Sequence, residues 1–329
     1  MIGYWKRKKV FVTGCTGLLG PWLIERIVQE GADIVALIRD HVALSNFYLL
    51  GLDRKVSVVS GDVTDLALLE RILNEYEVET VFHLAAQAIV LTANRSPVST
   101  FESNIRGTWS LLEAARRSPW VKRIVVASSD KAYGEQPELP YDEEMPLRPT
   151  NFYDVTKASA ELISQAYYKS YQLPVAIARC GNLYGGGDLN FNRIVPGTIE
   201  SVHHGASPVI RSDGQYVRDY FYVMDAVEAY LALAQNMDSP DGVVGQAFNF
   251  SNEQPITVLE LVKRILKRMG REDLKPEVLG SAKGEIIHQY LSSRKSREDL
   301  GWKAKFSLDK GLEHTVAWYR NFFAGRIRQ

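Results

Sequence analysis

The segment TGCTGLLG (13–20) constrains the fold most strongly, because it joins an apolar run to a helical pattern. The run KKVFVT (8–13) predicts a buried strand, and the amphipathic pattern over 18–30 predicts a helix. Three glycines between them would permit a tight turn, close approach of a pyrophosphate and close helix–strand packing: Gly14, Gly17 and Gly20. The N-terminus of a helix also favours an anion. The segment therefore predicts a dinucleotide-binding unit.

Short apolar runs alternate with longer helical patterns through the first half of the chain. Strands are predicted at 8–13, 33–38, 56–60, 80–85, 123–128 and 175–180. Helices are predicted at 18–30, 65–76, 98–117 and 155–171. Such alternation implies a parallel sheet covered on both faces, and the right-handed crossover rule makes it doubly wound. The predicted fold class is therefore α/β, with a Rossmann-type parallel sheet.

The alternation stops after Cys180. GNLYGGGDLNFNR (181–193) predicts a loop, and QAFNFS (246–251) predicts an isolated strand. Further helices are predicted at 225–235, 257–269 and 308–322. The expected division is a dinucleotide-binding domain of residues 1–180 plus about 218–252, and a smaller C-terminal α/β substrate-binding lobe of residues 181–217 and 253–329.

Composition excludes several classes of protein. Lys plus Arg and Asp plus Glu balance at 39 each, so no overall field favours nucleic acid or an anionic membrane. The only two cysteines, Cys15 and Cys180, exclude a disulfide framework and zinc-type spacing. No apolar run approaches the roughly 20 residues of a membrane span, and the N-terminus lacks the apolar core of a signal peptide. A cytoplasmic protein without a metal site is expected.

The segment YDVTK (153–157) places Tyr153 and Lys157 one helical turn apart, so that their side chains share a face. A lysine cation there would lower the phenol pKa from about 10. Tyr153 could then take or give a hydroxyl proton, with Ser129 at the end of the preceding strand as its partner. This set predicts acid–base chemistry on a hydroxyl group.

Together these motifs resemble the extended branch of the short-chain dehydrogenase/reductase superfamily, which contains the nucleotide-sugar epimerases and dehydratases. The resemblance covers nearly the whole chain, through GDVTD (61–65), HLAAQ (83–87), NIRGT (104–108), GNLYGGGD (181–188), VRDYFYVMDAVEAY (217–230) and LGW (300–302). It implies a tightly bound NAD(P), a nucleotide-sugar substrate, and a homodimer formed through the helices near 98–117 and 153–171.

The resemblance also implies which residues bind these molecules. Those implied for the cofactor are Gly14, Thr16, Gly17, Leu18, Gly20, Asp62, Val63, Leu84, Ala85, Ala86, Tyr153 and Lys157. Among them, Asp62 and Val63 would flank the adenine, and Lys157 would bind the nicotinamide ribose. Those implied for the substrate are Asn104, near the catalytic centre, and Asn182, Arg193 and Arg218. The two arginines suit a diphosphate, because a guanidinium binds phosphate oxygens in pairs.

The end of the second predicted strand, ALIRD (36–40), bears on the choice of cofactor. NAD-preferring relatives place an acid at the position of Ile38, where it accepts hydrogen bonds from the ribose. Here Arg39 follows an apolar residue and could pair with a 2′-phosphate, as in mannose-type dehydratases, whereas Asp40 would oppose this. The alternative is that Arg39 stacks on the adenine. The sequence favours NADP over NAD.

The stretch ASSDKAYGE (127–135) narrows the reaction. The order Ser129-Asp130-Lys131 resembles the hydroxyl, acid and base of the CDP-glucose 4,6-dehydratases. By that resemblance Tyr153 takes the proton of the sugar 4-hydroxyl while C4 passes hydride to the nicotinamide. Lys131, with a lowered pKa, then removes the C5 proton, and Asp130 protonates the departing 6-hydroxyl.

The sequence thus predicts a nucleotide-sugar 4,6-dehydratase of the CDP-glucose or GDP-mannose type. Two alternatives stay open. One is a 4-epimerase or reductase of the same superfamily, in which Asp130 and Lys131 form a surface pair. The other is a non-catalytic dinucleotide-binding protein, which the set of Ser129, Tyr153 and Lys157 argues against.

Overall fold

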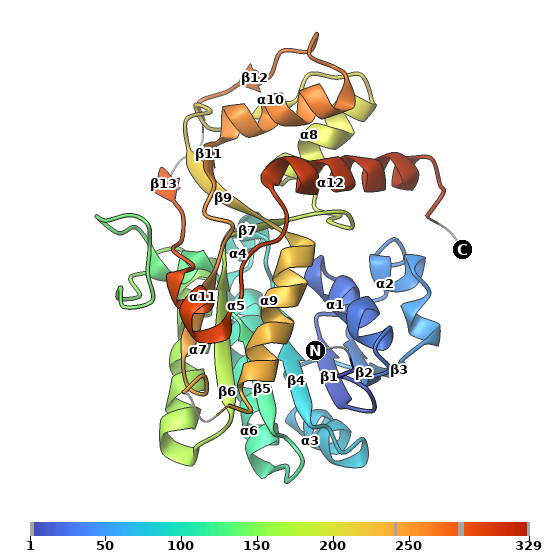
Figure 1. Cartoon of the computed structure of the whole chain (residues 1–329), viewed down its shortest axis with the longest axis vertical. Coiled ribbons are helices and arrows are strands. Elements are labelled where there is room, and N and C mark those ends of the chain that lie inside the picture. Colours follow the sequence, from blue (N-terminus) through green and yellow to red (C-terminus); the bar gives the residue numbers. More distant parts are fainter. Residues whose placement is uncertain (1–2, 240–241, 282–285, 328–329) are drawn as a thin grey trace.

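A seven-stranded parallel sheet forms the centre of the protein in a computed structural model that describes residues 3–239, 242–281 and 286–327 (Figure 1). Every pairing between neighbouring strands is parallel. In spatial order the strands are β3 (Ser57–Ser60), β2 (Asp33–Ile38), β1 (Lys9–Thr13), β4 (Thr80–His83), β5 (Arg123–Ala127), β6 (Val175–Cys180) and β10 (Ala247–Phe250). The order reverses beside β1, which confirms the doubly wound prediction.

Helices cover both faces of this sheet and enclose two separate apolar cores. One core lies between the sheet and the helices α1 (Leu19–Val28) and α9 (Val223–Asn236). The other lies beneath α3 (Leu66–Glu75), α6 (Gly107–Arg117) and α7 (Phe152–Tyr171). Because both faces are buried, the central strands are apolar almost throughout, which explains why their positions are readable from the sequence.

A smaller lobe sits at the carboxyl ends of the central strands (Figure 1). In it, β9 (Val217–Tyr222) pairs with three short strands: β7 (Asn182–Tyr184), β11 (Pro255–Thr257) and β13 (His288–Gln289). A two-stranded sheet of β8 (Val209–Ile210) and β12 (Glu277–Val278) lies farther out. Three helices complete the lobe: α8 (Ile194–His203), α10 (Val258–Met269) and α12 (Leu308–Phe323).

Shorter helical segments join these elements. Those near the cavity described below are α4 (Val90–Arg95), α5 (Pro97–Phe101), the π-helical turn η2 (Glu102–Arg106) and the 3-10 turn η3 (Asp130–Tyr133). The others are α2 (Asn46–Leu49), the 3-10 turn η1 (Leu52–Arg54) and α11 (Arg294–Leu300). Within the described ranges, no helix is both long and apolar enough to span a membrane.

Three expected elements differ from the structure. The predicted helix 98–117 contains the π turn η2, and α6 starts at Gly107, where a Cβ atom would lie only 2.5 Å from Cγ1 of Val63. QAFNFS is not isolated, because β10 extends the central sheet beside β6. The predicted loop 181–193 contains β7. The domain division stays a prediction: β9 pairs within the lobe, whereas α9 and β10 return to the central sheet.

Candidate active site

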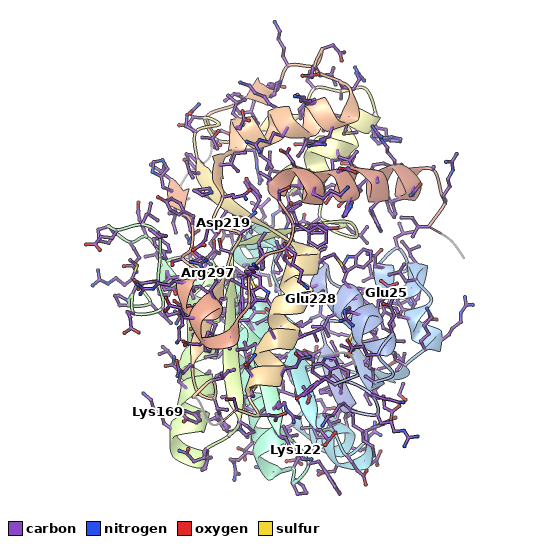
Figure 2. All side chains as sticks on the ribbon, in the orientation of Figure 1. Glu25, Lys122, Lys169, Asp219, Glu228 and Arg297 are labelled. Carbon is purple, nitrogen blue, oxygen red and sulfur yellow. The ribbon has the colours of Figure 1, made fainter. Side chains whose placement is uncertain are left out.

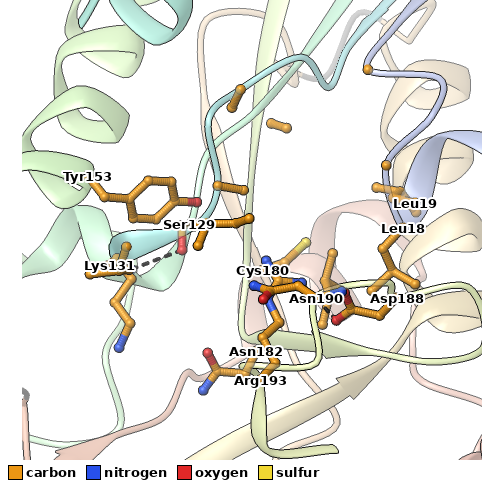
Figure 3. Close-up of a pocket in the computed structure, with 18 of the residues that line it drawn as sticks. Leu18, Leu19, Ser129, Lys131, Tyr153, Cys180, Asn182, Asp188, Asn190 and Arg193 are labelled. Carbon is orange, nitrogen blue, oxygen red and sulfur yellow. Dashed lines mark hydrogen bonds and ion pairs between the residues drawn. The ribbon is translucent and has the colours of Figure 1, made fainter. Parts of the chain in front are cut away.

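A cavity of about 920 Å³ lies between the carboxyl ends of the central strands and the lobe (Figure 3). It is the place where a doubly wound sheet binds its ligands. Most of the predicted site residues line it: Gly14, Thr16, Gly17, Leu18, Gly20, Arg39, Val63, Leu84, Ala85, Ala86, Ser129, Lys131, Tyr153, Lys157, Asn182, Arg193 and Arg218. Three predicted residues do not line it: Asp62, Asn104 and Asp130.

The glycine-rich turn has two different steric requirements. Gly14 has φ +74°, and a Cβ there would lie 2.7 Å from the carbonyl carbon of Leu84. A Cβ at Gly20 would lie 2.5 Å from O of Gly14. Gly17 differs, because a Cβ there would make only an ordinary contact of 3.4 Å. The fold of the chain therefore requires glycine at Gly14, in the turn, and at Gly20, where the helix packs on the strand. A pyrophosphate bound close to the backbone would explain the glycine at Gly17.

A buried hydrogen-bond chain that the sequence did not reveal fixes the wall beside this turn. Thr13 Oγ1 accepts from the N–H groups of Leu84 and Ala85, at 3.2 and 3.1 Å. Its own hydroxyl must therefore donate to Nδ1 of His83 at 3.0 Å, and Nε2–H of His83 donates to Thr108 at 3.0 Å. Burial lowers the pKa of His83 to about 3, so its ring stays neutral. The segment HLAAQ includes His83, but no sequence pattern indicated that its partners would be Thr13 and Thr108.

Asp62 and Asn104 are held away from the cavity by their own hydrogen bonds. The Asp62 carboxylate accepts from N and Oγ1 of Thr64, both at 2.8 Å. Asn104 lies in the π turn; its Oδ1 accepts from Gln87 N at 2.7 Å, and its Nδ2 donates to Thr156 Oγ1 at 2.8 Å. Both side chains form hydrogen bonds within the protein and do not line the cavity, in which Asp62 was predicted to contact the adenine and Asn104 the substrate.

Tyr153 and Lys157 occupy the cavity wall on α7, as the helical spacing predicted. The Lys157 amine donates to the carbonyl oxygen of Ala127 at 2.7 Å and lies 5.9 Å from the centroid of the Tyr153 ring. Burial lowers the pKa of Lys157 to about 8, against the opposing effect of Glu161. Burial raises the pKa of Tyr153, which Arg193 and a hydrogen bond with Ser129 oppose. The expected lowering of the phenol pKa is therefore not seen in the protein alone.

The row Ser129-Asp130-Lys131 divides between the cavity and the interior. Ser129 is in extended backbone just before the 3-10 turn η3, and Asp130 and Lys131 begin the turn. Successive side chains in a 3-10 turn point about 120° apart, so Asp130 and Lys131 face different directions. Ser129 and Lys131 line the cavity (Figure 3), whereas the Asp130 carboxyl is buried and accepts a hydrogen bond from the Ser129 hydroxyl at 2.9 Å. Within the described part of the chain, the other Asp130 oxygen has no hydrogen-bond partner.

A buried ion pair supports this turn from behind. Glu161 on α7 and Arg179 on β6 are both buried, and Nη2 of Arg179 lies 2.7 Å from Oε2 of Glu161. Ser128 donates to the same carboxylate, and Arg179 donates to the hydroxyl of Tyr133 in η3 at 2.6 Å. A charged residue within the apolar run VAIARC was the sequence signal that could have indicated it.

The two arginines on the lobe side have different surroundings. Arg193 forms an ion pair with Asp188 at 3.0 Å and lines the cavity close to Asn182 (Figure 3). The buried Arg218 guanidinium donates to the carbonyl oxygens of Ile286, at the short end of the hydrogen-bond range, and of Ile287 at 2.9 Å. Both arginines add positive charge to the lobe side of the cavity, where the diphosphate is predicted.

Asp219, next to Arg218 in β9 (Figure 2), is a buried carboxyl with a raised pKa. Burial, with a further contribution from Asp130, raises it from 3.8 to about 7, although a hydrogen bond from Ser251 opposes the shift. Between these values the folded protein binds more protons than the unfolded chain does. The stabilising effect of protonated Asp219 is therefore present at low pH and is lost as the pH rises through about 7.

This predicts the behaviour of Asp219→Asn, which cannot ionise. Between about pH 4 and pH 8, the free energy of unfolding should fall more in the wild type than in the variant, by on the order of 2–4 kcal/mol. Urea unfolding of both proteins at several pH values measures the difference. Parallel pH dependences in the two proteins would mean that Asp219 ionises normally.

Comparisons with known proteins agree with this site. The family described as GDP-mannose 4,6 dehydratase matches residues 11–315. A CDP-glucose 4,6-dehydratase from Salmonella typhimurium is 28% identical, over 98% of this chain and 93% of its own length.

Two solved structures have the same fold. A dTDP-glucose 4,6-dehydratase from Bacillus anthracis, in complex with NAD, has a TM-score of 0.84 at 27% identity, covering 95% of this chain and 97% of its own. A UDP-glucose 4-epimerase from Thermotoga maritima, with UDP-glucose, has a TM-score of 0.87 at 29% identity, covering 96% and 99%.

The family match covers most of the chain, including the glycine-rich turn, the Tyr153–Lys157 pair and the Ser129–Lys131 turn. It confirms the resemblance to the extended short-chain dehydrogenases/reductases that the motifs indicated. The chain belongs to the GDP-mannose 4,6 dehydratase family.

Proposed function

We propose that the protein is a nucleotide-sugar 4,6-dehydratase, which converts an NDP-hexose of the CDP-glucose or GDP-mannose type to the NDP-4-keto-6-deoxyhexose. The observation that carries the proposal is the meeting of Lys131 with Ser129 and Tyr153 at one cavity. Ser129, Tyr153 and Lys157 alone would suit any dehydrogenase-type step on a hydroxyl. The additional amine supplies the base that elimination requires. The names of the relatives support the same reaction.

The residues present fit NAD(P), because Gly17 lines the cavity although the chain itself does not require glycine there, and because Thr13 fixes the wall beside the turn. When bound, the dinucleotide would accept hydride from the sugar C4 and return it to C6. Tyr153 would take the 4-hydroxyl proton, and Ser129 would donate a hydrogen bond to the same oxygen once its hydroxyl turns from Asp130 to the sugar. Lys157, held by the Ala127 carbonyl, would orient the ribose.

Elimination of water needs one proton removed at C5 and one delivered to O6. Lys131 lines the cavity and would take the C5 proton, which the 4-ketone makes acidic. The electron pair left at C5 would form the C5–C6 double bond as the 6-hydroxyl departs. Asp130 is the predicted proton donor, and it does not line the cavity itself. Because the Ser129 hydroxyl donates to Asp130 in the structure, delivery to O6 would require a protonated Asp130 that donates to Ser129 while Ser129 turns its own hydrogen toward O6. After hydride returns to C6 and a proton returns to C5, the net change is the loss of one water.

The nucleotide end of the substrate would lie on the lobe side. Arg193, Arg218 and Asn182 line the cavity there, and the guanidinium groups suit the diphosphate oxygens.

We further propose that Arg39 gives the protein a preference for NADP over NAD. Arg39 lines the cavity, and its Nε donates to Asp40 at 2.7 Å. Arg39→Ala should weaken NADP binding by about tenfold and leave NAD binding nearly unchanged, because only NADP carries the 2′-phosphate. Isothermal titration of both dinucleotides measures this, with Arg54→Ala as an exposed control. Equal losses for the two dinucleotides would contradict the assignment.

A homodimer is also proposed, through the outer faces of α6 and α7. Large apolar side chains on and beside these helices are exposed: Val98, Trp109, Phe152, Leu162 and Tyr171. Such a concentration on one side of a globular protein is typical of an interaction surface.

Incubation with CDP-, GDP-, UDP- and dTDP-hexoses tests the function. We expect mass spectrometry to show that one of them loses a single water without net consumption of NAD(P). Isomerisation at constant mass would instead identify a 4-epimerase, the alternative that the similarity to the Thermotoga maritima enzyme keeps open.

A further inference from the structure

The buried amide of Gln289 connects the lobe to the predicted catalytic turn. Gln289 is the last residue of β13, and its side chain is fully buried. Its Nε2 donates to the carbonyl oxygen of Asp130 at 2.9 Å, and its Oε1 accepts from the Lys131 amine. One amide thus contacts two consecutive residues of η3, from a part of the chain in which no motif indicated a functional residue.

The orientation of this amide is fixed by its partners. The Asp130 carbonyl can only accept a hydrogen bond, so the amide nitrogen must face it and the amide oxygen must face Lys131. The backbone is held as well, because Gln289 is paired with Arg218 in the β13–β9 register. Just beyond it, Tyr141 N donates to the carbonyl oxygen of Tyr290 at 2.9 Å. Gln289 therefore presents one acceptor to the amine from a rigid support.

An amide is a suitable partner for a lysine that acts as a base. It accepts a hydrogen bond without adding a charge, whereas a carboxylate would favour the protonated amine. Among the described residues, the charged groups near Lys131 include Asp130 in the same turn and Asp154 on α7, whose carboxyl pKa is raised by burial, an effect that Lys131 opposes. Because the Gln289 amide carries no charge, this contact holds the amine without favouring its protonated form as a carboxylate would.

The same segment also holds Arg218, through the carbonyl oxygens of Ile286 and Ile287. Residues 286–289 thus link the arginine predicted to bind the diphosphate with the amine predicted to remove the C5 proton. The Lys131 side chain extends away from Tyr153 (Figure 3), and its amine donates to Gln289.

We propose that Gln289 is a positioning residue for Lys131, which it holds through a neutral acceptor at the C5 side of the sugar. The catalytic consequence rests on the proposed function. The contact itself does not, so the two can be tested separately.

Two variants and one control test the proposal. Gln289→Glu keeps the shape and adds a charge, Gln289→Met removes the acceptor, and His288→Ala alters the exposed neighbour in the same strand. The protonation of Lys131 is measured in each protein by acetylation with acetic anhydride across a pH series, followed by mass spectrometry of the Lys131 peptide. Dehydration is measured as kcat and KM over the same pH range.

In Gln289→Glu, the midpoint of Lys131 acetylation should move up by about 1–3 pH units, and the acid limb of kcat should move with it. In Gln289→Met, kcat should fall by about 10- to 100-fold with little change in KM, because the amine is misplaced while the binding groups remain. His288→Ala should match the wild type in both measurements.

An unchanged acetylation midpoint in Gln289→Glu, or an unchanged kcat in Gln289→Met, overturns the positioning role. If the midpoint moves but the wild type removes water from no nucleotide hexose, the contact is supported and the proposed function fails.

Discussion

Replacing Lys131 with alanine is expected to lower kcat for dehydration by about 10²–10⁴-fold, the usual contribution of a general base. Lys131 and Ser129 are the only two members of the predicted row that line the cavity, within the described residues. The variant removes the C5 base but leaves Tyr153, Lys157 and the glycine-rich turn in place. Single-turnover mass spectrometry of the nucleotide sugar measures the loss.

A matched control is Lys122→Ala. Lys122 lies at the opposite end of the sheet from the cavity (Figure 2), where it forms an exposed ion pair with Glu79 at 2.7 Å. Its removal should leave kcat unchanged. If Lys131→Ala instead retained full activity on a nucleotide sugar, Lys131 would not be the base, and the 4-epimerase alternative would gain support.

The second large effect is expected on stability. Glu161→Leu should lower the free energy of unfolding by about 3–5 kcal/mol, because Arg179 would be left as an uncompensated buried charge. The loss would also release Ser128 and, through Arg179, the hydroxyl of Tyr133, which lie on either side of the row Ser129–Lys131. Urea unfolding of the variant measures the change.

The double variant Glu161→Leu/Arg179→Met distinguishes the contribution of the charges to the free energy of unfolding from the contribution of side-chain packing. Removing both members of a buried ion pair leaves no unpaired charge, so much of the stability should return. Additive losses from the two substitutions would mean that the pair contributes through shape and not through charge. In either protein, disturbed placement of Ser129 should lower kcat even where the fold is retained.

The sheet was largely predictable from the sequence, for a physical reason. Five of the six expected strands are buried almost throughout, so an apolar run is the simplest sign of each; the exception is β3, at the edge of the sheet, which is mostly exposed. Each of the six ends within about two residues of its predicted end. β10 was harder, because AFNF contains a polar residue. That residue, Asn249, is buried and accepts from the hydroxyl of Tyr133 at 2.8 Å.

The site was predictable only where the residues follow a fixed local geometry. Tyr153 and Lys157 share a helical face by their spacing alone, and both line the cavity. Asp130 does not, because a 3-10 turn sends its side chain inward. Gln289 could not be predicted, since its contact with Lys131 depends on how β13 pairs in the lobe.

The most direct test of the proposed dehydratase follows a label from C4 of the sugar. The CDP-, GDP-, UDP- and dTDP-hexoses would each be supplied with deuterium at C4 of the sugar. The product would be analysed by mass spectrometry and NMR. The proposed reaction predicts a product that has lost one water, carries a 4-ketone, and holds the deuterium at C6. Deuterium retained at C4 in a product of unchanged mass would contradict a dehydratase.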